Sequence, residues 1–204
     1  MKKIIWGQKE IETALEKIAG ETIFKEPSYV EVVDNRIYFY ANVETEQVLK
    51  LNKEIRDLNN DLLVAAKIQE REPAFIFLHI NSDGGSMFDG IAGMDTILKS
   101  QIPIVTIVDG CCASAATFLS VVGRKRCIHE NSFMLIHQLS GGAWGKFKEL
   151  QDENVNFIRL MMLIKSIYLK YTKIPIEKLD EILDHDLWFD AKTCLEYGLV
   201  DEIL

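Results

Sequence analysis

Apolar and polar residues follow two different periods in the first third of the chain. In the segment 29–41 they alternate on either side of Asp34-Asn35, which predicts a β-hairpin. In the segment 44–70 apolar residues recur every three or four positions, which predicts one long amphipathic helix; they are Val48, Leu51, Ile55, Leu58 and Leu62. A weaker helical pattern covers residues 10–18.

From residue 75 onward, short apolar runs alternate with helical patterns. This alternation is typical of an α/β fold, in which right-handed crossovers return the chain to a parallel sheet. No repeat or linker interrupts it, so one domain is expected. Strands are expected at 75–80, 104–108 (ending at Asp109-Gly110) and 133–136, and helices from about 87 to 99 and 114 to 122.

A second long helix is expected at 146–173, after several glycines. Its apolar residues cover much of its circumference and include Phe147, Leu150, Val155, Phe157, Ile158, Met162, Leu163, Ile167 and Tyr168. This surface either packs on the chain's own core or is covered by another subunit, and the pattern favours neither. Shorter helices are expected after Pro175 and at 191–197, where Gly198 is placed to end the last one.

Composition and charge narrow the function classes. The chain has 204 residues, 48% of them hydrophobic and 26% charged, which is typical of a globular protein. A net charge of −8 disfavours nucleic acid as a partner. No signal peptide or apolar run long enough for a membrane span is evident, so a cytoplasmic location is expected.

The cysteines do not form a metal-binding pattern. None of the four belongs to a CxxC pair, so neither zinc nor any other cofactor is expected. They are interpreted as reduced core residues. The adjacent Cys111-Cys112 leaves a redox role open, although no other feature of the sequence supports it.

A glycine-containing loop, 81–86, lies between a predicted strand and a predicted helix. Its glycines, Gly84 and Gly85, allow a sharp turn and bring backbone N–H groups close to a ligand. Three interpretations remain open: a phosphate cradle, a simple helix-start turn, and an oxyanion-hole donor. The phosphate site is the weakest of these, because neither GxGxxG nor GxxxxGK[ST] is present.

Ser114 lies among very small residues where a helix is expected to begin. A nucleophile there would benefit from the helix dipole, and the N–H of Ala115 would point to the developing oxyanion. A helix N-cap is the simpler alternative. The motif is not the GxSxG elbow, since Cys112 stands two residues before the serine.

Histidine is scarce, which limits the choice of a general base. Of His79, His129, His137 and His185, only His137 ends an apolar strand beside a glycine-rich loop. Catalytic groups gather at such strand ends, although a core-edge histidine is the alternative. The acid that would orient it is either Asp184 or Asp186, and periodicity does not choose between them.

Four blocks of sequence resemble the Clp protease proteolytic subunit (ClpP) family. The blocks are 80–86, 110–118, 134–142 and 196–201, and they occur in the family's order and spacing. The resemblance is weaker over 36–73 and absent over the first thirty residues. It implies a divergent N-terminal segment, 1–30, and one peptidase domain, 31–204, with the ClpP/crotonase-type fold of repeated β-β-α units. A protruding handle is expected at about 139–173.

The resemblance also implies a set of site residues. Ser114 would be the nucleophile, His137 the general base and Asp186 the acid of a triad. The backbone N–H groups of Gly85 and Ala115 would form the oxyanion hole. The peptide would bind as an added strand between two segments that contain Gly84, Ser86, Gln138 and Leu139.

Members of this family stack two heptameric rings through the handle and receive unfolded polypeptide from a AAA+ unfoldase. A homo-oligomer of this kind is therefore expected. Several residues depart from the family's pattern: Asp83 and Leu139 replace prolines, Ala115 and Ala116 replace methionine and glycine, His79 replaces an aromatic of the unfoldase docking pocket, and His185 replaces an arginine between subunits. A divergent bacterial, organellar or phage-encoded member is indicated.

The sequence therefore predicts a serine endopeptidase, and three other functions compete with it. A crotonase-type acyl-CoA enzyme shares the fold but uses carboxylate bases. A membrane-linked signal-peptide peptidase uses serine and lysine. A non-catalytic ring subunit that assembles with an active one is the third, although such subunits usually lack a triad residue.

Overall fold

The computed structural model of the protein describes residues 29–204. The helix expected at 10–18, and almost all of the divergent segment 1–30, lie outside the described residues.

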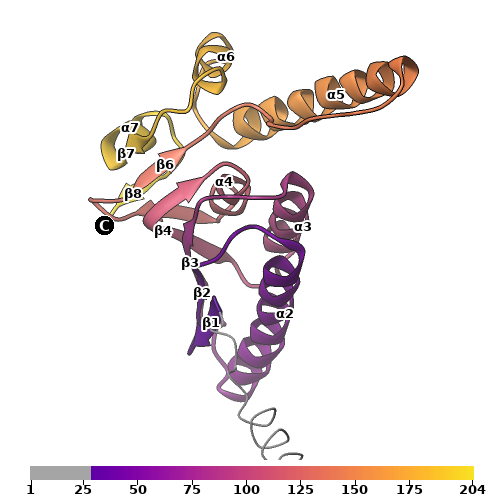
Figure 1. Ribbon diagram of the computed structural model, residues 1–204. Helices are drawn as coiled ribbons and strands as arrows, with labels where there is room; N and C mark the ends of the chain where they lie inside the picture. The colour runs from indigo at the N-terminus through magenta and orange to yellow at the C-terminus, as the bar shows by residue number, and fades with distance from the viewer. Residues whose placement is uncertain (1–28) are drawn as a thin grey trace, which may run out of the picture.

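One mixed sheet with helices packed on it forms the body of the protein (Figure 1). The strands run in the order β1-β2-β3-β4-β5-β8, while β6 pairs with β4 and β7. All pairs are parallel except β1–β2 and β6–β7. The strands are β1 (Val30–Val33), β2 (Arg36–Phe39), β3 (Ile76–Ser82), β4 (Ile104–Ala113), β5 (Lys125–Ile128), β6 (Phe133–Leu135), β7 (Phe189–Asp190) and β8 (Glu202–Ile203).

The helices follow the predicted order. The predicted hairpin is also present, with Asp34 in a left-handed conformation at its turn (φ 54°). The helices are α2 (Thr45–Ile68), α3 (Met87–Leu98), α4 (Ala116–Ser120), α5 (Phe147–Tyr171), α6 (Ile176–Leu183) and α7 (Ala191–Glu196). After α7, Gly198 adopts a left-handed conformation (φ 65°), as expected for a residue that ends a helix.

Strand β4 is longer than predicted, and this correction concerns the site directly. The expected end at Asp109-Gly110 is wrong, because the strand continues to Ala113. Its first half pairs with β3 and β5, and its second half pairs with β6 from Cys111 to Ala113. Gly110 connects the halves with a positive φ of 79°. Pairing with neighbours on both sides therefore outweighs the local turn preference of Asp-Gly.

Helix α4 is shorter than predicted. The expected span of 114–122 is wrong at both ends, because the helix covers only Ala116–Ser120.

The strands β5, β7 and β8 were not expected from the pattern. Charged Lys125-Arg126 opens β5, and the other two strands have only two residues each, so none of them shows a clear alternation.

Helix α5 projects from the body, and the segment 139–146 runs along it (Figure 1). Only Ile164, Ile167 and Tyr168, near its C-terminal end, are buried. Toward its N-terminus large apolar side chains are exposed, including Phe147 (77%) and Met162 (66%). The chain's own core therefore covers only one end of this helix. No helix in the part of the chain from 29 to 204 is long and apolar enough to cross a membrane.

Candidate active site

Ser114 lies in the turn between β4 and α4, in a conformation that few non-glycine residues adopt. Its φ is 53°, in the left-handed region, which costs an ordinary L-residue roughly 1–2 kcal/mol. The residue at the helix N-cap is Ala115, so the N-cap interpretation of Ser114 is wrong. The backbone N–H of Ser114 donates to Leu135 O at 2.8 Å, which attaches this turn to β6.

His137 and Asp186 complete a hydrogen-bonded chain that starts at this serine. His137 Nε2 lies 2.7 Å from Ser114 Oγ, and its Nδ1 lies 2.8 Å from Asp186 Oδ1. The histidine lies two residues after the end of β6, and the aspartate lies in the loop between α6 and β7. Of the two aspartates that periodicity left open, the one that contacts the imidazole is Asp186, which the resemblance had implied.

The glycine loop packs against the serine turn. A Cβ placed on Gly84 would lie 2.7 Å from both Ser114 Cβ and Ala113 O, so only glycine allows this approach. Gly85 forms a β-bridge with Val43. Within residues 29–204, the backbone N–H groups of Gly85 and Ala115 donate to no other protein group. Both remain available to an oxyanion beside Ser114.

A pocket of about 200 Å³ opens in front of Ser114. Ser86, Gln138 and Leu139 line it, whereas Gly84 does not line it and packs against the Ser114 turn. The remaining lining residues are Gly85, Met87, Ala115, Phe118, His137, Ser140, Ile164 and Tyr168. The lining is mixed, with apolar side chains from Met87, Phe118, Leu139 and Ile164 beside the polar groups.

Sequence reasoning missed several of these residues. Met87, Phe118 and Ile164 were interpreted only as parts of helices, although they contribute apolar side chains to the lining of the pocket. Thr117 and Tyr168 were also missed; they form a buried hydrogen bond directly beneath the Ser114 turn. The only signal for Thr117 was its position three residues after Ser114, which is one helical turn.

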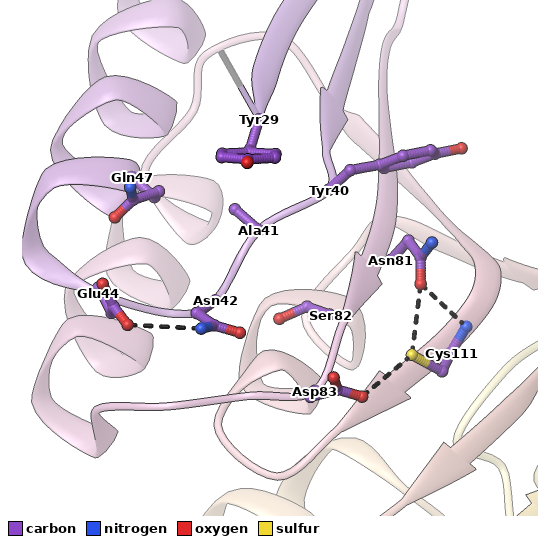
Figure 2. A pocket seen from close by; sticks show the side chains of 10 residues that line it. All are labelled: Tyr29, Tyr40, Ala41, Asn42, Glu44, Gln47, Asn81, Ser82, Asp83 and Cys111. Carbon is purple, nitrogen blue, oxygen red and sulfur yellow. Dashed lines mark hydrogen bonds between the residues drawn. The ribbon is translucent and has the colours of Figure 1, made fainter. Parts of the chain in front are cut away.

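Asp83 lines a different pocket, together with Asn81, Ser82 and Cys111 (Figure 2). This second cavity has a volume of about 500 Å³ and is polar, and Asp83 does not line the pocket that contains Ser114. Its carboxylate instead accepts a hydrogen bond from the Cys111 thiol at 3.5 Å. Any effect of the Asp83 charge on substrates therefore acts through the loop rather than by contact in the Ser114 pocket.

The cysteines are free, as predicted. Burial, followed by the nearby Asp83 charge, raises the pKa of the Cys111 thiol, and burial also raises the pKa of Cys112. Both thiols therefore stay protonated at neutral pH, which disfavours a redox role. Among residues 29–204 no group of acidic, histidine or cysteine side chains is arranged to hold a metal ion.

The other histidines lie away from Ser114. His79 and His129 both contact Asp109, at 2.8 Å and 3.1 Å. Burial alone would raise the pKa of Asp109, but hydrogen bonds from His79 and Tyr40 hold it below its ordinary value. His79 therefore belongs to a hydrogen-bonded cluster with Asp109 and Arg36, and its ring stacks on Tyr38. His185 is exposed in the loop beside Asp186.

Comparisons with known proteins identify the family of the chain. The sequence model of the Clp protease family matches residues 32–204, so it includes the stretch 36–73 where the motifs are weaker. The chain is 32% identical to the ATP-dependent Clp protease proteolytic subunit of Chlorokybus atmophyticus over 193 residues, covering 92% of this chain and 81% of that protein. It is 31% identical to the protein of the same description from Mesostigma viride, covering 92% and 80%. The chain belongs to the Clp protease family.

Proposed function

We propose that the protein is a serine endopeptidase in which Ser114 is the nucleophile, His137 the general base and Asp186 the acid that orients it. The observation that carries this proposal is the continuous hydrogen-bonded chain from Ser114 Oγ through both imidazole nitrogens to the Asp186 carboxylate. A serine hydroxyl is a weak nucleophile and needs such a base.

The chemistry follows from the order of these contacts. Asp186 accepts from Nδ1–H, so the lone pair of His137 Nε2 faces the Ser114 hydroxyl. As Ser114 Oγ attacks the peptide carbonyl, His137 takes its proton and later delivers it to the leaving amine. The carbonyl oxygen becomes negative between the N–H groups of Gly85 and Ala115. Water then hydrolyses the acyl-enzyme by the same proton transfers.

The substrate that this site fits is an extended, unfolded polypeptide. Ser86 and Gln138-Leu139 belong to two separate segments that line the pocket with Ser114, and they would hold a peptide as an added strand. Met87, Phe118 and Ile164 form an apolar part of the pocket lining, which would accept an apolar side chain next to the scissile bond.

The proposal also covers the partner of the protein, its oligomeric state and its cellular compartment. The relatives are described as ATP-dependent, so we infer that a AAA+ unfoldase supplies the substrate, through a docking region altered at His79. The exposed apolar surface of α5 supports two stacked heptameric rings joined through this helix. The free thiols are consistent with a reducing cytoplasmic compartment.

Charges introduced on the exposed face of α5 are expected to dissociate this assembly. Ile158 and Met162 lie one turn apart and are exposed in the single chain. The double substitution Ile158→Glu/Met162→Glu should therefore leave the fold of the subunit intact while reducing the particle mass in native mass spectrometry. The matched control is Gln151→Glu, an exposed polar position of the same helix. An unchanged mass for the double variant would contradict a role of α5 in assembly.

Covalent labelling tests the nucleophile directly. A fluorophosphonate reacts with a serine only where a base activates its hydroxyl. We expect the assembled protein to be labelled at Ser114, the Ser114→Ala variant to be unlabelled, and the Ser166→Ala variant to react like the wild type. Ser166 is a suitable control because its hydroxyl only bonds Leu163 O in its own helix. Failure to label an assembled wild-type protein would favour the non-catalytic ring subunit.

A further inference from the structure

A buried chain of hydroxyl groups lies directly beneath Ser114 and connects it to helix α5. Thr117 Oγ1 donates to the carbonyl oxygen of Ser114 at 2.6 Å, and the same hydroxyl lies 2.7 Å from Tyr168 Oη. Thr117 is fully buried and Tyr168 is 1% exposed. The chain thus runs from the handle helix, through α4, to the backbone of the serine.

The directions of these hydrogen bonds follow from their partners. A carbonyl oxygen can only accept, so the single hydroxyl proton of Thr117 goes to Ser114 O. Tyr168 must then donate its own proton to Thr117 Oγ1. Burial raises the pKa of Tyr168, so its hydroxyl keeps this proton. Each donation strengthens the next one along such a chain.

The carbonyl at the end of this chain belongs to the residue with the unusual backbone conformation. A positive φ in a non-glycine residue persists only where its surroundings hold it in place. The Ser114 N–H is held by Leu135 O, and the Ser114 carbonyl accepts from both the backbone N–H and the hydroxyl of Thr117. Without the hydroxyl, one of the contacts that fix this peptide group is lost.

Tyr168 also contributes to the substrate pocket. It lines the cavity in front of Ser114 together with Ile164, from the same end of α5, and its ring packs against Phe118 at a centroid distance of 5.9 Å. The residue that donates into the hydroxyl chain is therefore also part of the pocket wall. A shift of this end of α5 would alter the support of the serine and the shape of the pocket together.

We propose that Thr117 and Tyr168 are positioning residues that hold Ser114 in its attacking conformation and couple the placement of α5 to the reactivity of the nucleophile. This inference rests on the proposed role of Ser114. It assigns to α5 a function within the subunit, in addition to the role in assembly proposed for its exposed apolar surface.

Isosteric substitutions test the hydroxyl chain. Thr117→Val removes the hydroxyl and keeps the shape of the side chain, whereas Thr117→Ser keeps the hydroxyl. We expect Thr117→Val to slow both fluorophosphonate labelling of Ser114 and kcat for a peptide by roughly tenfold to a hundredfold, the effect of a misplacement of about 1 Å, with KM changed much less. Thr117→Ser should recover most of the rate, and Tyr168→Phe should lose less than Thr117→Val.

A second buried threonine supplies the matched control. Thr106 is equally buried and donates its hydroxyl to Ser120 O, away from Ser114. Thr106→Val is expected to lower the melting temperature about as much as Thr117→Val without slowing the labelling of Ser114. Both substitutions should leave the particle mass unchanged.

The outcomes separate this inference from the proposed function. A Thr117→Val variant that is less stable but labels at the wild-type rate would overturn the positioning role, and so would a Thr117→Ser variant as slow as Thr117→Val. A Tyr168→Phe variant with wild-type rates would overturn the coupling to α5. Wild-type protein without label on Ser114 would instead reject the proposed function.

Discussion

Replacing His137 with alanine is expected to lower kcat for peptide cleavage by on the order of 10⁴-fold or more. The reason is that His137 Nε2 is the only base within hydrogen-bond distance of Ser114 Oγ in the described part of the chain. Without it the hydroxyl keeps its proton at the moment of attack. The measurement is steady-state cleavage of a short fluorogenic peptide, which needs no unfoldase.

The double variant gives this prediction its sharpest form. If Ser114 and His137 act as one unit, Ser114→Ala/His137→Ala should be no slower than either single variant, because each substitution alone already removes the proton transfer. Multiplicative losses in the double variant would mean that the two residues act independently, and would contradict the proposed triad. His129→Ala serves as the histidine control, since His129 contacts Asp109 and not the site.

Asp186 is expected to matter less than His137. Its side chain is 77% exposed, so water can replace part of its interaction with the Nδ1–H group. Asp186→Asn should still slow cleavage, because the asparagine amide can favour the wrong tautomer of His137. A smaller loss for Asp186→Asn than for His137→Ala is therefore the expected order.

The fold could be predicted wherever one period dominates a segment. The alternation around Asp34-Asn35 and the three-to-four spacing along α2 each reflect a single buried face, so the sequence suffices for both. Strand β4 shows the limit of this approach. Whether the chain turns or continues at Asp109-Gly110 depends on β6 pairing with Cys111–Ala113, and that pairing is a contact between distant segments.

The candidate site depends on such contacts throughout. The residue types and their neighbourhoods make Ser114 and His137 candidates, and the resemblance assigns their roles, but 23 positions separate them and 49 separate His137 from Asp186. Periodicity alone could not choose between Asp184 and Asp186, because the contact with the imidazole depends on the tertiary structure. Thr117 and Tyr168 were still harder to find, because a buried threonine and a buried tyrosine look like ordinary core residues until their hydroxyl groups meet.

The glycine at position 84 is expected to be as important to catalysis as a side chain of the site. Its φ of 98° is unfavourable for any L-residue, and an added Cβ would lie 2.7 Å from Ala113 O, a backbone atom of β4 that cannot easily shift. Gly84→Ala should therefore displace the loop that carries the N–H of Gly85. Because the loss of one oxyanion donor costs about 10²–10³ in kcat, we expect a fall of that size in peptide cleavage. Gly142→Ala is the matched control, since a Cβ there meets nothing within 4 Å, and it should cleave at the wild-type rate. Wild-type kcat in a folded Gly84→Ala protein would mean that the close approach of this loop to Ser114 does not form the oxyanion site.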